Sequence, residues 1–184
     1  AEQAPTGADI ASRRWLIIRD PETKAKIAEL YRGAGTGSST GDTGRDSGRD
    51  TGREPGREPG RKLGDNNPRQ RVSESAAHLA ANIERVPVLV LVTVLGTHDG
   101  SGRPGLFDSV IQAAWSFCLA LRSRGLGTAW TTRHLANSEG IAQLLGIPEG
   151  VTQVVLLPVG WTIGDDFRPA RRRDASEITW FDRW

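Results

Sequence analysis

The hydrophobic pattern of the first residues predicts a strand followed by a helix. Residues 15–18 form a continuous apolar run with the length and composition of a short buried strand. Asp20 and Pro21 follow it, and they are a favourable N-cap and a favourable first helical residue. Apolar residues then recur with helical spacing from Ile27, and this stripe ends near Arg32. We therefore expect one strand and one amphipathic helix within residues 1–32.

Periodic structure returns after residue 72 and predicts three further units of a helix followed by a strand. Residues 108–124 are apolar on nearly all sides, so we expect this helix to be central and covered on most sides. The expected elements are a helix from Ser73 that ends before Pro87, a strand over 88–95, the helix over 108–124, a strand over 129–132, a helix over 137–145 and a strand over 151–161.

Residues 33–71 break these patterns. From Gly44 the sequence repeats every four residues as GRDS, GRDT, GREP, GREP and GRKL, and Leu63 is the one large aliphatic residue of the segment. A helix with glycine at every fourth position would lose about 1 kcal/mol for each glycine relative to alanine. No apolar surface is present to offset the ordering entropy. We interpret 33–71 as a disordered insert.

The order of these elements predicts an α+β or α/β layered domain with a mixed sheet flanked by helices. Residues 1–32 would form its first part, and residues 72–184 would form the main part with a C-terminal extension. That extension ends in three large aromatic residues, Trp180, Phe181 and Trp184. If no cavity in the same subunit accommodates them, the surface that covers them belongs to a partner.

Composition and charge narrow the functional classes. The chain has 24 basic and 22 acidic residues and a net charge of +2, which gives no long-range attraction to nucleic acids or membranes. No apolar run approaches the ~20 residues of a membrane helix. A single cysteine, Cys118, favours a reducing compartment, so we expect a cytoplasmic protein. The chain starts at Ala1 and contains no methionine, so we expect its natural start to lie upstream.

The sequence gives little support for a metal site, a catalytic nucleophile or a phosphate-binding loop. No histidine has a second potential ligand at i+3 or i+4, and no serine elbow or phosphate-binding Walker loop is present. Cys118 lies within the apolar helix, where it reads as a small buried hydrophobic residue. We therefore assign no metal ligand and no catalytic side chain.

Anion recognition is the remaining signal. Arg171, Arg172 and Arg173 form a dense cluster of guanidinium groups, which suit bidentate phosphate binding. A solvated charged loop explains the cluster equally well. The turn at Thr6 and Gly7 offers a hydroxyl and backbone amides, although most such turns are only turns.

Thr131 and Thr132 are a further candidate for ligand binding. They stand at the end of a predicted strand and could present backbone amides to a ligand, or they could simply pack within the sheet.

Several stretches together resemble the nitroreductase family, particularly its actinobacterial-type members. They include the Pro-Thr-Gly turn leading into the first strand, the end of the central helix with its Gly-Leu-Gly-Thr sequence, and the Leu-Pro-Val-Gly-Trp sequence of the last strand. The likeness covers roughly residues 1–32 and 73–184. The stretches that carry it are residues 4–9 and 14–18, 86–90, 113–116 and 119–128, 145–149 and 157–161, 169–172 and 182–184.

The resemblance implies an α+β homodimer that binds FMN at the subunit interface. Hydride would pass from NADH or NADPH to FMN and then to a nitroaromatic, a quinone or a similar small-molecule acceptor, and the cofactor would carry the redox chemistry. By position, the resemblance places Pro5, Thr6, Gly7 and Asp9 at the edge of the flavin, Trp130, Thr131 and Thr132 against its ring, and Arg171, Arg172 and Arg173 at its phosphate.

The sequence also departs from the family pattern. The family's Arg-rich N-terminal segment is absent, so we expect an N-terminally truncated member, and Asp9 and Ala11 replace the usual Asn and Gln. An ionised Asp cannot donate a hydrogen bond and repels an anionic reduced flavin. Two other hypotheses therefore stay open: a degenerate scaffold with weak or no flavin binding, and an RNA-binding role for the Arg-Gly repeat. The repeat lacks interleaved aromatic residues, which disfavours RNA.

Overall fold

The computed structural model describes residues 1–6, 12–33, 68–98, 105–164, 166–167 and 172–183. The predictions for Gly7, Asp9 and Arg171, and the disorder expected for most of the insert, fall outside these residues. Helix α2 begins at Pro68. Residues 68–71 lie within the predicted insert, but they are helical.

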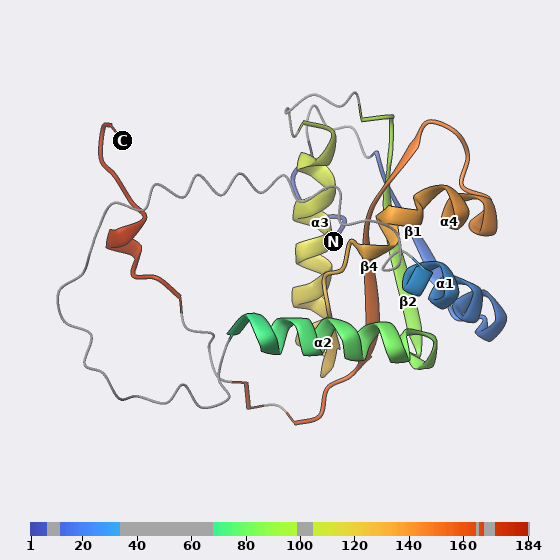
Figure 1. The fold of residues 1–184 in the computed structure, drawn as a ribbon. Helices are drawn as coiled ribbons and strands as arrows, with labels where there is room; N and C mark the ends of the chain where they lie inside the picture. The colour runs from blue at the N-terminus through green and yellow to red at the C-terminus, as the bar shows by residue number, and fades with distance from the viewer. Residues whose placement is uncertain (7–11, 34–67, 99–104, 165, 168–171, 184) are drawn as a thin grey trace, which may run out of the picture.

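A four-stranded sheet with the order β1-β2-β4-β3 forms the centre of the molecule (Figure 1). Its strands are β1 (Arg13–Ile18), β2 (Val88–Leu95), β3 (Leu126–Thr128) and β4 (Val151–Trp161), and each neighbouring pair is antiparallel. The prediction of a mixed sheet was wrong in this respect. The order of helices and strands along a sequence does not fix strand direction, which depends on the side from which each connection re-enters the sheet.

A β-bulge interrupts the pairing of the two central strands. Val92 lies opposite Val155, whereas Thr93 lies opposite Gln153, so Val154 is the additional residue on β4. Thr93 is fully buried, and the Gln153 side-chain amide donates to the carbonyl oxygen of Ser138 at 2.7 Å. The bulge therefore leaves Gln153 directed toward the helices on one face of the sheet.

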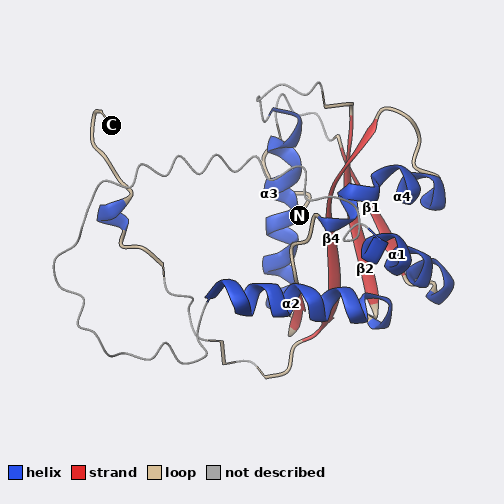
Figure 2. Ribbon diagram, in the orientation of Figure 1, coloured by secondary structure: helices blue, strands red, loops and turns tan. Residues whose placement is uncertain are grey.

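One face of the sheet is covered by several helical segments (Figure 2). The first core cluster lies between them and the sheet, with Tyr31, Ile83, Leu91 and Ile141 among its buried side chains. The segments are α1 (Pro21–Gly33), α2 (Pro68–Asn82), η2 (Ile83–Arg85), η3 (Arg133–Asn137) and α4 (Ser138–Leu145).

Helix α3 (Gly105–Arg122) packs on the opposite face. Its inner side, with Val110 and Ala114 fully buried, contacts the second core cluster, which includes Val92 and Val155. Its outer side is exposed, and Trp115 retains 59% of its surface. A single chain therefore does not cover this helix on most sides, contrary to the expectation from its apolar composition.

Local signals in the sequence account for several helix ends. The Asp20 carboxylate accepts hydrogen bonds from the backbone amide and the hydroxyl of Thr23, both at 2.7 Å, and this confirms the predicted cap of α1. Gly146 ends α4 in the left-handed conformation with φ of 63°, and Gly125 follows α3 with φ of 74°.

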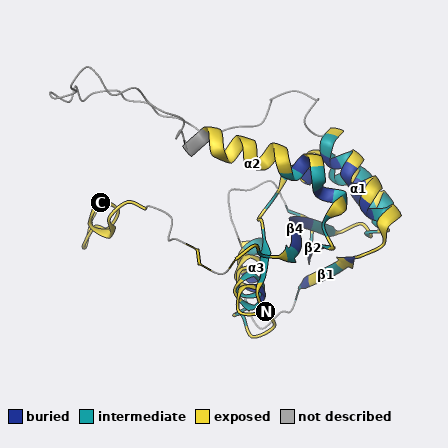
Figure 3. Ribbon diagram, turned by 90° about the horizontal axis from the view of Figure 1, so that it is seen from below, coloured by how far each residue is buried: buried dark blue, intermediate teal, exposed yellow. Residues whose placement is uncertain are grey.

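After β4, the described residues 162–164, 166–167 and 172–183 belong to a C-terminal arm, which carries the short 3-10 helix η4 (Ala175–Glu177). The arm lies apart from the sheet and helices (Figures 1 and 3). Phe181 on this arm is 83% exposed and Trp180 is 49% exposed. Across the described residues, no helix combines the length and apolar character needed to cross a bilayer.

Candidate functional site

The N-terminal turn, with Pro5 and Thr6, is fixed to β1 through Glu2. The Arg13 guanidinium donates to the Glu2 carboxylate at 3.1 and 3.3 Å and to its backbone carbonyl at 3.0 Å, and the Trp15 indole donates to the same carboxylate at 3.2 Å. These bonds, chiefly that from Arg13, lower the pKa of Glu2 below its usual value. The turn that precedes β1 is thus tied to the side of the sheet that carries α3.

Residues 130–132 form the second part of the predicted site. The amide of Thr131 donates to the carbonyl of Leu156 at 3.2 Å, and the amide of Leu156 donates back at 3.0 Å. The Thr131 hydroxyl shares a 2.7 Å hydrogen bond with the Tyr31 hydroxyl. The amide, the carbonyl and the hydroxyl of Thr131 are therefore all engaged within the chain, whereas Trp130 is 43% exposed.

Arg133 follows this segment directly and contacts the end of α1. Its Nε donates to the backbone carbonyl of Tyr31 at 3.0 Å, and a terminal nitrogen donates to that of Arg32 at 3.4 Å. The guanidinium also lies 5.5 Å from the centre of the Tyr31 ring. Sequence analysis missed both Tyr31 and Arg133, because contacts between residues about a hundred positions apart leave no local pattern.

His134 is the other residue here that the sequence did not single out as buried. Its side chain is 1% exposed, and both ring nitrogens are buried without a hydrogen-bond partner. Burial lowers its pKa to about 4. The imidazole is therefore neutral near pH 7. Among the described residues there is also no cluster of three potential metal ligands.

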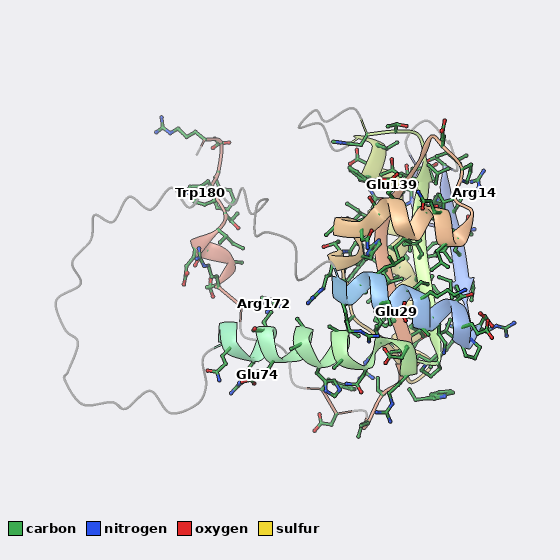
Figure 4. The ribbon with its side chains drawn as sticks, turned by 45° about the vertical axis from the view of Figure 1, so that its right-hand side comes forward. Arg14, Glu29, Glu74, Glu139, Arg172 and Trp180 are labelled. Atoms are coloured by element: carbon green, nitrogen blue, oxygen red, sulfur yellow. The ribbon has the colours of Figure 1, made fainter. Side chains whose placement is uncertain are left out.

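Arg172 and Arg173 lie on the C-terminal arm and are exposed. Figure 4 shows Arg172 away from the sheet, together with Trp180 on the same arm. Within one chain, the arm that carries both arginines lies apart from the sheet to which residues 130–132 and the N-terminal turn are attached (Figure 1).

The N-terminal turn and residues 130–132 also lie at opposite edges of the sheet. The turn leads into β1 at one edge, whereas Thr131 extends the line of β3 at the other edge by pairing with Leu156. Strands β2 and β4 lie between, so the edges are about 14 Å apart at the usual strand spacing. One ligand ring cannot easily touch both parts of a single chain.

A hollow of about 390 Å³ lies between the start of α4 and the start of β4. It is lined by Leu135, Ser138, Glu139, Ala142, Val151, Thr152 and Gln153. None of the predicted flavin contacts is among these residues, so the hollow is separate from the predicted site.

Comparison with protein families shows to which family the chain belongs. The model of the nitroreductase family matches residues 1–161, which is most of the chain. The chain belongs to the nitroreductase family. The resemblance inferred from the sequence is thereby confirmed, and membership of this family supports flavin-dependent oxidoreductase chemistry.

Solved structures share the nitroreductase fold at low sequence identity. Iodotyrosine deiodinase bound to FMN and 3-iodo-L-tyrosine matches with a TM-score of 0.58 and 20% identity, over 94% of this chain and 77% of that chain. A putative NADH dehydrogenase/NAD(P)H nitroreductase from Parabacteroides distasonis matches with a TM-score of 0.61 and 17% identity, over 99% and 79%. The NADPH:FMN oxidoreductase from Vibrio harveyi complexed with NAD+ matches with a TM-score of 0.63 and 14% identity, over 100% and 64%. No curated protein sequence matches this nitroreductase-family chain.

Proposed function

We propose that this protein is an FMN-dependent oxidoreductase that transfers hydride from NADH or NADPH, through the flavin, to a nitroaromatic, a quinone or a similar small acceptor. The family match over residues 1–161 supports this proposal. Two of the similar structures are described as binding FMN or acting on it. Bound FMN would supply the hydride chemistry, and the protein would bind and orient it.

The separation of the predicted contacts is the observation that carries the proposal, because it points to a site built by two copies of the chain. The N-terminal turn and residues 130–132 lie at opposite edges of one sheet. In a two-fold dimer, the turn of one protomer can approach residues 130–132 of its partner. A flavin between them would then touch both parts. We therefore propose a homodimer with the cofactor at the interface.

Exposed apolar surface supports the same dimer. Ile111, Trp115 and Leu119 follow one another at every fourth position along α3, so they form one stripe, and each is about half exposed or more. Trp180 and Phe181 on the C-terminal arm are also exposed. Contiguous apolar surface of this kind marks an interaction site.

The two described arginines of the arm suit the phosphate of the cofactor. Arg172 and Arg173 carry planar, permanently charged donors that can bind phosphate in a bidentate manner. Their arm starts near α3, where the Arg122 guanidinium lies 4.2 Å from the centre of the Phe167 ring. An arm that leaves the α3 face is placed to cross an interface formed by that face.

Reconstitution with FMN followed by anaerobic titration with NADH and NADPH tests the proposal. We expect a yellow dimeric protein whose flavin absorbance is bleached by one of the two nucleotides. Arg172→Ala should weaken FMN binding about tenfold, because hydrogen bonds to charged groups contribute about 1.5–3 kcal/mol. Arg85→Ala, which removes an exposed arginine of η2, is the matched control and should bind FMN like the wild type.

A second candidate is a nitroreductase-fold scaffold that binds little or no flavin. The hydrogen bonds of Thr131 within the chain favour this candidate, because the amide and the hydroxyl that could contact a ligand are already satisfied. The same reconstitution separates the two candidates. A colourless dimer that retains no flavin at saturating FMN would reject the oxidoreductase and leave the scaffold.

A further inference from the structure

The end of α1 is fastened to residues 131–133 by side chains from both sides. The Tyr31 hydroxyl and the Thr131 hydroxyl share a 2.7 Å hydrogen bond, and the Arg133 side chain donates to the backbone carbonyls of Tyr31 and Arg32. We call these contacts the α1 tether. Because α1 packs on the sheet while Thr131 pairs with its edge, the tether joins an edge segment to the core.

The contacts of the α1 tether restrict the movement of residues 131–133 relative to α1. Tyr31 is 2% exposed and belongs to the first core cluster, so its hydroxyl has little freedom to move. The last carbonyls of a helix lack partners within the helix, and the C-terminus carries partial negative charge. Arg133 supplies both the missing donors and the opposite charge. The Thr131 hydroxyl also lies 3.4 Å from the backbone amide of Arg133, which draws the segment into a tight turn.

We propose that Tyr31 and Arg133 are positioning residues for the flavin segment, residues 130–132. They hold the backbone of Thr131 against α1, and this fixes the placement of its exposed neighbours Trp130 and Thr132. Neither Tyr31 nor Arg133 needs to touch the cofactor. The expected effect on cofactor binding rests on the proposed function, because residues 130–132 are the part expected to lie against the flavin ring.

A preformed segment changes binding more than it changes the fold. If the segment moved freely in the empty protein, FMN would have to order it on binding, and that ordering would weaken the affinity. The tether removes part of this cost before the cofactor arrives. Loss of the Tyr31 hydroxyl should therefore loosen the segment locally while the central strands remain as they are.

Amide hydrogen exchange in the cofactor-free protein tests the tether directly. Tyr31→Phe removes one hydroxyl, and Thr131→Val removes its partner with little change of shape. Each should speed exchange of the Thr131 amide about fivefold, which corresponds to one neutral hydrogen bond. The double variant should be no faster than either single variant. Thr131→Ser keeps the hydroxyl, so its Thr131-position amide should exchange within about twofold of the wild-type rate, unlike that of Thr131→Val.

The amide of Leu91, in the middle of β2, is the internal reference. If Leu91 and Thr131 accelerate together, Tyr31 only supports the whole fold and the positioning role is wrong. An unchanged Thr131 rate in Tyr31→Phe would also overturn it. Thr152→Val is the matched control elsewhere, because it removes a hydroxyl that donates to the carbonyl of Gly96 at 2.7 Å. It should leave the exchange of Thr131 unchanged.

FMN affinity provides the second measurement. Tyr31→Phe should raise the Kd for FMN about fivefold, and Thr152→Val should not change it. If the wild type binds FMN and Tyr31→Phe binds it equally well, the positioning role is overturned. If the wild type binds no FMN, the proposed function fails, and the exchange rates of Thr131 and Leu91 still decide whether the tether orders the segment.

Discussion

His134 is neutral because it is buried, without help from a charged or hydrogen-bonding neighbour. Both ring nitrogens lie inside the protein, and desolvation lowers the pKa of the imidazole to about 4. In the unfolded chain the same group has a pKa of about 6.5. The unfolded state therefore binds a proton in a pH range where the folded state does not, and acid favours unfolding.

The free energy of unfolding should fall as the pH decreases from about 6.5 to about 4. One proton taken up by the unfolded state corresponds to a slope of about 1.4 kcal/mol per pH unit, and the total loss is about 3 kcal/mol. Urea titrations at several pH values measure this slope. His134→Leu should reduce it by one proton, whereas carboxylates such as Glu2, Asp20 and Glu84 titrate in both proteins. Equal slopes in both proteins would contradict the burial argument.

Single residues show where sequence reasoning succeeds and where it ends. The Asp20 cap could be predicted, because the acceptor and the amide that it binds are three residues apart. The α1 tether could not, because Tyr31 and Thr131 meet only after the sheet has formed. The residues themselves made Thr132, Arg172 and Arg173 candidates for ligand binding, whereas their roles toward a flavin, and that of Trp130, come from family resemblance and remain predictions.

At the scale of elements, patterns within one continuous run were the most informative. Strands β2 and β4 match the predicted ranges 88–95 and 151–161. Long runs of β-branched and aliphatic residues that lie between glycine or proline residues strongly favour a strand. The short strand was misplaced. We predicted it over 129–132, whereas β3 spans Leu126–Thr128 and Thr131 forms a separate bridge. Pairing with β4 decides that position, and a single sequence does not reveal pairing.

Gly146 offers a test of how one element ends. It adopts φ of 63°, and no atom lies within 4 Å of the position that a Cβ would occupy. Gly146→Ala should therefore lower the free energy of unfolding by about 1 kcal/mol through backbone strain, with no steric clash. Gly105→Ala is the matched control, because Gly105 lies in α3 with equally open surroundings and no positive φ. It should be neutral or slightly stabilising, and an equal loss in both variants would contradict the strain argument.

At the scale of the whole molecule, the α3 stripe and the C-terminal arm leave large apolar side chains exposed to solvent. The inner side of α3 is buried in the second core cluster, so its outer apolar side chains are not needed to hold the helix on the sheet. Their exposure is unfavourable in water unless another surface covers them. The proposed homodimer supplies that surface.

Trp115→Glu tests the proposed dimer. A carboxylate in the middle of the α3 stripe would have to be buried without a partner, which costs several kcal/mol. We expect the wild type to be dimeric and Trp115→Glu to be a folded monomer in sedimentation experiments at micromolar concentration. Val72→Glu is the control, because Val72 is an equally exposed apolar residue on α2. A wild-type monomer, or a Trp115→Glu dimer as tight as the wild type, would contradict the interface.

The additional residue at Val154 has a consequence for how this sheet can vary. Side chains alternate between the two faces of a strand, so the bulge is what allows the amide of Gln153 and the apolar side chain of Leu156 to share the helical face. If every residue of β4 were kept and paired without the bulge, the start of the strand would turn over and the amide would be directed into the apolar layer beneath α3. Loss of the additional residue alone would leave Gln153 on the helical face, whereas an insertion or deletion of one residue elsewhere in β4 would turn one end of the strand over.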